Sequence, residues 1–275
     1  MNQQFRIKGL YIHHTLSKSD PADEFKLHCH TKAEILYFVS GDIQYRIEGS
    51  VLCPKPSSVL LIAPHVVHGL KLRSSTPYQR YALHFSPSML TEYGRQFMDI
   101  CYSRTGCFEN ADSYGIRPVL DDILALERVV KDELKTKAAS ILLDMLLFKL
   151  SLLSASANRI GSENSSADIR PVIDYINNNI AEDITLGLLS SRFYISRQHL
   201  SRLFKAATGA NVGRYVAYKR VSLARRYIKE GMTASEAASA VGFTDYSVFY
   251  RNYTRILGYN PTQEKERTLD DNGHI

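Results

Sequence analysis

The feature of this sequence that most constrains its fold is a helical pattern that occurs twice, with Ser196 matching Asp245 at an offset of 49 positions. The first copy, residues 196–209, carries apolar side chains at the i, i+3, i+4, i+7 spacing of a buried helix face: Leu200, Leu203, Phe204 and Ala207. A second face at the same spacing is polar and contains no acidic residue: Gln198, Ser201, Arg202 and Lys205. Ser196 is the expected N-cap and Gly209 the expected stop. The pattern predicts a short capped helix with one buried and one solvated face.

Residues 245–258 repeat this pattern. Their apolar face consists of Phe249, Tyr253 and Ile256, and their polar face of Ser247, Tyr250, Arg251 and Thr254. A shorter helix and a tight turn are expected before each copy, with the first helices at residues 186–192 and 235–241. Two short helices joined by a turn, the second polar on its outer face, indicate a helix-turn-helix. A single copy of this kind could equally be a solvated surface helix, but a duplicated unit is harder to obtain by chance.

At this point the chain resembles a known family. Residues 168–264 are similar to the DNA-binding domain of the AraC/XylS transcriptional regulators. The matching motifs are YI at 175–176, LSRLFK at 200–205, GF at 242–243 and GYNP at 258–261. The resemblance implies two helix-turn-helix units joined by a long helix. Residues 211–230 suit that helix, because they have an apolar side and are followed by Gly231.

The resemblance also implies which residues face DNA. In the first unit the base-facing positions are Gln198, Ser201 and Arg202. In the second they are Tyr246, Ser247, Tyr250 and Arg251. Phosphate contacts are expected from Arg197, Lys205 and Arg255. Residues 253–254 are Tyr-Thr where the family usually has Phe-Lys, which removes one expected phosphate contact.

Charge is consistent with a nucleic-acid partner. The net charge is +6, and residues 192–226 contain nine Lys or Arg and no Asp or Glu. A basic surface attracts the phosphate backbone through counterion release, although membrane or RNA would attract it too. Double-stranded RNA is disfavoured because its major groove is too narrow for an inserted helix. Duplex DNA is therefore the expected partner.

The N-terminal half has a different pattern. Short β-rich runs are expected at residues 5–14, 35–39, 43–47, 59–62 and 79–85, with turn signals at 40–42, 48–50 and 54–56. Such spacing predicts an antiparallel sandwich or small barrel. The region resembles a cupin (jelly-roll) barrel through His28, His30, Glu34 and Gly41, spaced HxHxxxEx6G, followed by PHVVH ending at His68.

Residues 28, 30 and 34 share parity, so in one regular strand their side chains would lie on one face, with Cys29 on the other. His68 would join them from a neighbouring strand. Three imidazoles and a carboxylate could bind a divalent transition metal such as Zn²⁺, Fe²⁺, Mn²⁺ or Ni²⁺. They could equally line a sugar- or acid-binding pocket, or satisfy buried hydrogen bonds. The second cupin motif lacks its usual glycine, and His65 is a substitute ligand or a rim residue.

Other polar and aromatic residues of the barrel are candidates for effector contact: Tyr37, Tyr45, Arg46, Tyr81 and His84. Which of them point inward depends on strand register, because a slip of one residue inverts the set. The expected effector is a sugar or another small metabolite.

Residues 118–153 change to helical period and predict two helices separated near residues 135–137. The second is apolar nearly all round. The family resemblance implies a dimer interface there, and the alternative is a hairpin packed wholly against its own barrel. Residues 154–167 are rich in Ser, Asn and Ala and read as a linker. The expected domains are therefore 1–153 and 168–267, with a frayed tail after 267.

Composition places the chain among cytoplasmic proteins. The N-terminus lacks the apolar region of a signal peptide, and the longest apolar run, residues 141–153, is broken by Asp144, Lys149 and Ser151, so no membrane span is expected. Four Cys without a CxxC pair indicate reduced thiols.

These observations predict a one-component transcriptional activator that forms a homodimer, works with RNA polymerase and is not an enzyme. The fold class is an N-terminal cupin-like barrel with a helical hairpin, followed by an all-α domain of two helix-turn-helix units. The alternative is a metal-dependent cupin enzyme, such as a dioxygenase or isomerase, fused to a DNA-binding domain. The histidine-rich set is the only support for that alternative.

Overall fold

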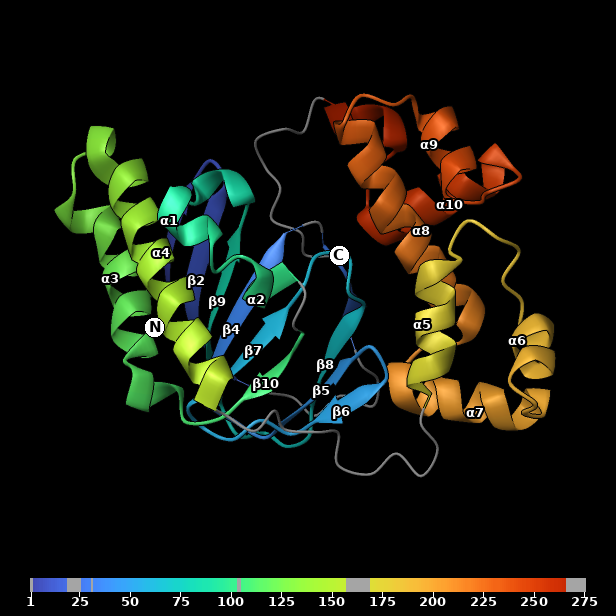
Figure 1. Cartoon of the computed structure of the whole chain (residues 1–275), viewed down its shortest axis with the longest axis horizontal. Helices are drawn as coiled ribbons and strands as arrows, with labels where there is room; N and C mark the ends of the chain where they lie inside the picture. The colour runs from blue at the N-terminus through green and yellow to red at the C-terminus, as the bar shows by residue number, and fades with distance from the viewer. Residues whose placement is uncertain (1, 19–25, 31, 103–104, 157–168, 266–275) are drawn as a thin grey trace.

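Two antiparallel β-sheets face one another, and helices cover the outer face of each (Figure 1). The computed structural model describes residues 2–18, 26–30, 32–102, 105–156 and 169–265. Sheet A has the order β1(Gln3–Ile7), β2(Leu10–Ser17), β9(Tyr78–Phe85), β4(Ala33–Ser40), β7(Ser58–Ile62) and β10(Gly106–Phe108). Sheet B has the order β3(Lys26–His28), β8(His68–Leu72), β5(Ile43–Ile47) and β6(Ser50–Leu52).

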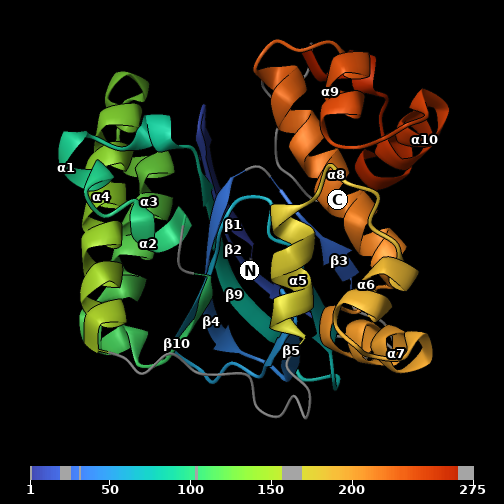
Figure 2. The same ribbon diagram turned by 45° about the vertical axis from the view of Figure 1, so that its right-hand side comes forward.

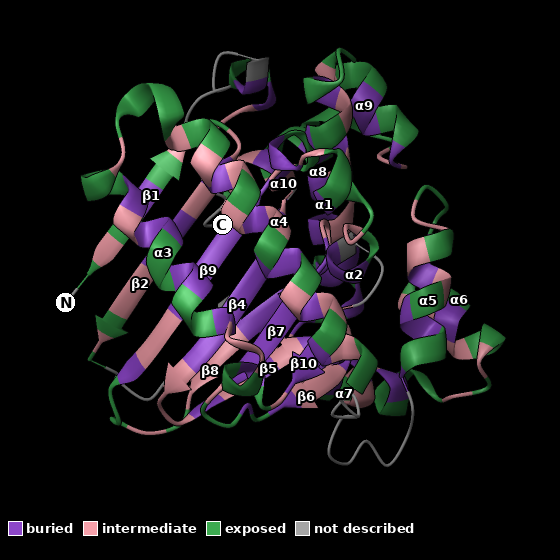
Figure 3. Cartoon of the chain, turned by 60° about the vertical axis from the view of Figure 1, so that its left-hand side comes forward, coloured by how far each residue is buried: buried purple, intermediate pink, exposed green. Residues whose placement is uncertain are grey.

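Both faces of sheet A are buried, as the purple central strands of Figure 3 show. On β4, Leu36 and Phe38 point between the sheets and pack with Tyr45 of sheet B. The alternate residues Ile35 and Tyr37 point outward into a second cluster beneath the helices. This two-residue alternation is why β4 and β7 are apolar at almost every position.

Helices α3(Ile116–Val129) and α4(Asp132–Ser156) cover the outer face of sheet A. Shorter elements connect the sheet to them: η1(Pro87–Met89), α1(Glu92–Arg95), α2(Asp99–Tyr102) and η2(Ala111–Tyr114). Two polar residues of α4, Asp144 and Lys149, form hydrogen bonds with these connecting segments. The Thr91 hydroxyl donates to Asp144, and Lys149 Nζ donates to the Tyr114 carbonyl at 3.1 Å.

The C-terminal domain consists of helices around a central long helix. The elements are α5(Arg170–Asn178), α6(Leu186–Arg192), α7(Arg197–Thr208), α8(Val212–Lys229), α9(Ala234–Ala240), α10(Tyr246–Leu257) and η3(Pro261–Lys265). The α6–α7 pair lies at one end of α8 and the α9–α10 pair at the other (Figures 1 and 2). The two units therefore have the predicted connection through one helix.

Sheet B packs its outer face against this C-terminal domain (Figure 2). Lys219 Nζ of α8 lies 2.6 Å from Glu48 Oε1 in the β5–β6 turn, and the ion pair is largely shielded from solvent. Arg46 Nη1 of β5 donates to the Lys205 carbonyl of α7 at 3.3 Å. Gly49 has a φ of +82° and lies so close to α5 that a Cβ there would come 2.7 Å from Ile173. Barrel and helices thus share one continuous interface.

Several predicted boundaries were wrong. Residues 5–14 are not one strand but the two strands of a hairpin, because Gly9 adopts a φ of +92° between them. The break between α3 and α4 falls at residues 130–131, so residues 135–137 lie inside α4. The helix predicted at residues 235–241 begins one residue earlier, because Thr233 caps it in a reciprocal capping box with Glu236.

Helix α4 also changes the expectation about membrane spans. By length and composition it is long and apolar enough to cross a membrane. Of its most apolar stretch, 33% is buried inside the protein. This is weak evidence for a span, because one face of α4 is part of the barrel core: Ala139, Leu143, Leu146, Leu147, Leu150 and Leu153. Helix α4 continues to Ser156, three residues into the predicted linker. Residues 157–167, and the tail after 267, lie outside the described residues.

A buried carboxylate fastens the end of the C-terminal domain. Glu264 Oε1 lies 3.1 Å from Arg225 Nε of α8, and Glu264 Oε2 accepts hydrogen bonds from the hydroxyls of Tyr253 (2.5 Å) and Tyr259 (2.6 Å). Burial alone would raise the pKa of Glu264, but the Arg225 charge and the two hydroxyls hold it below its usual value. The carboxylate thus joins α8, α10 and η3.

We expect Glu264→Gln to destabilise the protein by roughly 3–5 kcal/mol, because Arg225 loses its buried counter-charge. Thermal melts at pH 7 measure this, with the exposed Glu230→Gln as control. Since the folded pKa of Glu264 is lowered, its contribution is present above the unfolded carboxyl's pKa and is lost as the pH falls through the folded value. The difference between wild type and Glu264→Gln should therefore shrink in acid. A constant difference would show that the carboxylate charge is not what stabilises.

Candidate functional site

Helices α7 and α10 begin and end in the same way. The Ser196 hydroxyl accepts from the His199 amide, and the Asp245 carboxylate accepts from the amides of Ser247 and Val248. Glycines at left-handed φ, +79° at Gly209 and +78° at Gly258, end the helices. The predicted caps Ser196 and Gly209 are confirmed, and Asp245 and Gly258 have the same roles in the second copy.

The inner faces of the two helices are buried as predicted. On α7 these residues are Leu200, Phe204 and Ala207, with Leu203 partly buried, and on α10 they are Phe249, Tyr253 and Ile256. Phe204 packs edge-on against Tyr215 of α8, and Phe249 lies between Phe243 and Tyr253. The rings fix how each helix lies on α8, and so which side of it faces solvent.

The outer faces carry the ten residues predicted to contact DNA. Exposed are Arg197, Gln198, Arg202, Lys205, Tyr246, Ser247, Tyr250, Arg251 and Arg255, while Ser201 is partly buried. The first face is basic and the second is rich in tyrosine. Arg197 differs from the others, since its guanidinium lies against Gly187 of α6.

Two polar residues of these faces were missed. His199 Nδ1 lies 3.0 Å from Arg202 Nη2, and Asn252 Oδ1 accepts from Arg255 Nη2 at 2.6 Å. Each stands three residues before its arginine, the spacing at which helix neighbours meet. The three-residue spacing was the sequence signal that could have identified both residues. The two residues orient the arginine side chains at the solvent face.

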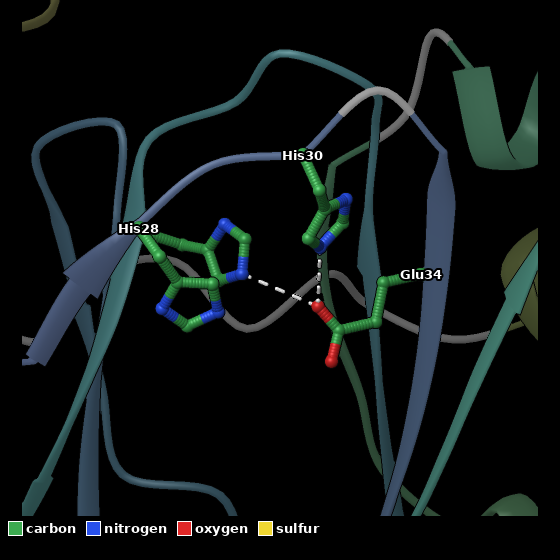
Figure 4. A group of neighbouring side chains, drawn as sticks. His28, His30 and Glu34 are labelled. Atoms are coloured by element: carbon green, nitrogen blue, oxygen red, sulfur yellow. Dashed lines mark hydrogen bonds and ion pairs between the residues drawn. The ribbon is translucent and has the colours of Figure 1, made fainter. Parts of the chain in front are cut away.

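A second group of polar residues lies inside the barrel. His28, His30, Glu34 and His68, here called the His/Glu cluster, place one potential ligand atom each within 4.8 Å of one another. Figure 4 shows the His30 ring pointing at the Glu34 carboxylate. Equal parity along one strand does not explain this convergence. His28 ends β3, where it pairs with His68 of β8, His30 lies in the following loop, and Glu34 belongs to β4 of the other sheet.

The hydrogen bonds of the cluster constrain where its protons lie. His30 Nδ1 lies 2.7 Å from the Lys32 carbonyl and His68 Nδ1 2.9 Å from the Val66 carbonyl, so we assign a proton to each Nδ1. Both Nε2 atoms then face Glu34 Oε2, at 2.9 and 3.2 Å. The His68 Nε2 approach lacks hydrogen-bond geometry, although the atom is fully buried. Lone pairs on neutral imidazoles would repel the carboxylate unless protons or a cation lie between them.

Charge favours the ionised carboxylate. Burial would raise the pKa of Glu34, but His84, which pairs with it across β4 and β9, and the close approach of His30 and His68 hold that pKa well below its usual value. An ionised carboxylate beside imidazoles whose Nδ1 protons are held by carbonyls is the arrangement of many metal sites. Tetrahedral zinc, about 2.0–2.1 Å from each ligand, separates two ligands by roughly 3.3 Å, so small shifts would fit an ion here.

His65 is not a member of the cluster. Its Nδ1 lies 2.8 Å from the Ser222 hydroxyl of α8, outside the barrel. Burial and the nearby cations Arg226 and Lys219 lower the pKa of His65 to about 4, so the ring is neutral. The idea that His65 replaces a missing ligand is therefore wrong for this structure.

The candidate effector residues divide by strand register. Tyr45 and His84 lie between the sheets. Tyr37 and Tyr81 lie beneath the outer helices, where their hydroxyls donate to Asp112 and Asp121. Arg46 faces the C-terminal domain. Only the first two are placed to meet a ligand held inside the barrel.

Two family models match the chain. One, described as an AraC-like ligand binding domain, matches residues 14–137, and the other, described as a helix-turn-helix domain, matches residues 189–267. The first begins within β2, spans the remaining strands of the barrel and ends in the first turns of α4. The second spans α7 to α10, including both predicted recognition helices.

Relatives match over most of the length. The probable transcriptional regulator LumQ of Photobacterium leiognathi is 24% identical over 86% of this chain and 90% of its own. The transcriptional activator RhaS of Escherichia fergusonii is 27% identical over 56% of each. A structure of ToxT from Vibrio cholerae covers 94% of this chain and 99% of its own at 12% identity, but its TM-score of 0.43 is too low to support an argument.

The two faces of α7 lead to opposite expectations for neighbouring substitutions. Phe204→Ala should lower stability by roughly 3–5 kcal/mol, because it removes a fully buried ring. Arg202→Ala, two positions away on the exposed face, should change stability by less than about 0.5 kcal/mol. Denaturant melts of both variants compare them directly, and a larger loss for Arg202→Ala would mean that the faces are reversed.

Proposed function

Because the chain belongs to the AraC family of helix-turn-helix transcriptional regulators, we propose that it binds specific double-stranded DNA in response to a small molecule held by its N-terminal domain. The observation that carries this proposal is the pair of capped helices with exposed, acid-free polar faces at the two ends of α8. One rigid helix between two recognition helices suits two successive stretches of major groove.

The contacts divide by chemistry. Gln198, Ser201 and Arg202 of α7 carry the donors and acceptors that read base edges. On α10 the readers are Tyr246, Ser247, Tyr250 and Arg251. Arg197, Lys205 and Arg255 lie at the margins of the faces and hold phosphates. The second helix therefore depends more on aromatic and hydroxyl contacts than the first.

The N-terminal barrel serves as the effector domain, with Tyr45, His84 and the His/Glu cluster between its sheets. Activation through RNA polymerase is the mode that we propose, in line with the activator relative. The protein acts where its DNA lies, in the cytoplasm. Its relatives are regulators rather than enzymes, so the barrel binds rather than converts its ligand.

A homodimer through α4 is the assembly that we propose. Four apolar residues on the outer side of this helix, here called the outer stripe, remain exposed: Ile141 (60%), Met145 (45%), Phe148 (45%) and Leu152 (45%). Their spacing alternates four and three residues, which is the a/d pattern of a two-helix seam. A second copy of α4 would cover the outer stripe. A hairpin packed wholly against its own barrel would leave no such apolar stripe exposed.

Mapping of bound sites across the genome of the source organism tests the function as a whole. We expect discrete sites that contain paired half-sites. Binding without any sequence preference would contradict the proposal.

Arg202→Ala and Arg251→Ala should each weaken binding to a mapped site by about 1–3 kcal/mol, because each arginine is placed to contact a base edge. Gel shifts with the mapped duplex and a scrambled duplex measure this, with Arg226→Ala on α8 as a basic control. Specific binding should fall far more than binding to the scrambled duplex. Equal losses on both would reassign these residues to phosphates.

Met145→Glu should yield folded monomers, because it places a charge in the outer stripe. Light scattering measures the mass, and Met232→Glu in the C-terminal domain is the matched control. Affinity for a two-site duplex should fall towards that for one site as avidity is lost. Leu146→Glu should instead unfold the barrel, since Leu146 is fully buried in its own core. A dimeric Met145→Glu protein would exclude this interface.

A further inference from the structure

The chain segments that carry the histidines of the His/Glu cluster also form part of the C-terminal domain's core. In residues 27–29, His28 belongs to the cluster, while Leu27 and Cys29 are buried among the residues of α5, α7 and α8. In residues 66–68 the same alternation occurs, with His68 in the cluster and Val67 in that core. Each histidine of these strands thus has a neighbour packed against the helices that support DNA recognition.

Hydrogen bonds continue the connection to α8. The Cys29 thiol donates to the Tyr218 carbonyl at 3.6 Å. The His65 amide donates to the His30 carbonyl at 2.8 Å, and the His65 ring lies 2.8 Å from the Ser222 hydroxyl. His65 adopts a left-handed φ of +63°, unfavourable for a residue with a side chain, so these contacts hold it in place. A path of two hydrogen bonds therefore joins the backbone of His30 to Ser222.

We propose that the His/Glu cluster binds one divalent transition-metal ion, and that this binding is energetically coupled to the docking of α8 on the barrel. Three imidazoles and one carboxylate suit an ion of the zinc, iron or nickel type. The ion would lie between Glu34 Oε2 and the Nε2 atoms of His30 and His68, which now approach that oxygen to 2.9 and 3.2 Å. Docking braces the segments that present His28, His30 and His68, so the docked arrangement is the one with an assembled site.

Coupling of this kind is reciprocal. A metal that binds the docked arrangement more tightly stabilises docking by that same factor, and loss of a docking contact lowers the metal affinity as far as it populates the undocked arrangement. The inference rests on the proposed function in one respect, because α8 supports both recognition helices. The metal would then set which geometry the two helices present to DNA.

The experiment uses full-length protein stripped by a chelator and titrated with Zn²⁺ against a chromogenic competitor. We expect one equivalent to bind tightly. His30→Ala should weaken binding by about 100-fold or more, beyond the loss usual for a residue that only orients a ligand. His14→Gln, a histidine on β2 outside the cluster, is the matched control and should bind normally.

Ser222→Ala tests the coupling, because it removes a side chain of α8 that does not touch the metal. We expect its Zn²⁺ affinity to fall by about fivefold or more. Ser239→Ala, an exposed serine of α9 in the same domain, should leave the affinity unchanged. Hydrogen exchange gives a second readout, since Zn²⁺ should slow exchange in residues 212–229 of the wild type, although no ligand lies there.

Each outcome decides a part of the proposal. No stoichiometric Zn²⁺ in the wild type overturns the metal site. Tight Zn²⁺ with unchanged affinity in Ser222→Ala and unchanged exchange in α8 overturns the coupling. If His30→Ala does not fold, Glu34→Gln replaces it, and exchange in the wild type still decides. Gel shifts on the same samples test the proposed function separately from the metal site. If the protein binds DNA specifically but binds no metal, the proposed function is supported and the metal site is wrong. If it binds metal but no specific DNA, the proposed function is wrong.

Discussion

The packing of the outer face of sheet B against α5, α7 and α8 is the contact on which the rest of this structure depends. Sheet A buries its outer face under α3 and α4, and sheet B would expose apolar side chains without the C-terminal helices. Gly49 permits the close approach to α5, and the Glu48–Lys219 ion pair lies at the edge of the interface. The ligand-binding domain and the helix-turn-helix domain therefore share a buried cluster, which lies directly between the barrel strands and α8.

Within the C-terminal domain, aromatic packing decides what faces solvent. Phe204 and Phe249 are buried against residues of the same core, so the polar sides of α7 and α10 are directed outward. Glu264 holds Tyr253 of α10 to Arg225 of α8, which fixes the second unit on the connecting helix. The orientation of the exposed polar faces of α7 and α10 is thus set by buried residues.

Helix α4 shows how composition alone can mislead. Its sequence is apolar nearly all round, which fits a membrane span, a core helix or an assembly helix equally well. Packing separates these uses. One side belongs to the barrel core, Asp144 and Lys149 are bonded to neighbouring connections, and four apolar residues of the outer stripe remain exposed. Leu146 and Leu150 of the same helix face the barrel core and do not belong to the exposed stripe.

The local features of this protein could be predicted from its residues alone: the capped helices α7 and α10, their buried faces, the connecting helix and most long strands. Each depends on residues within a few positions of one another, such as Ser196 with His199 or the 3.6-residue spacing of Leu200 and Phe204. Features that depend on residues far apart in the chain could be assigned only from the tertiary structure. The His/Glu cluster draws on β3, β4, β8 and a loop, so parity along one strand suggested its members but not the reason they meet. Strand pairing likewise placed Tyr37 under the helices and Tyr45 inside the barrel, because register is a property of the sheet and not of the strand.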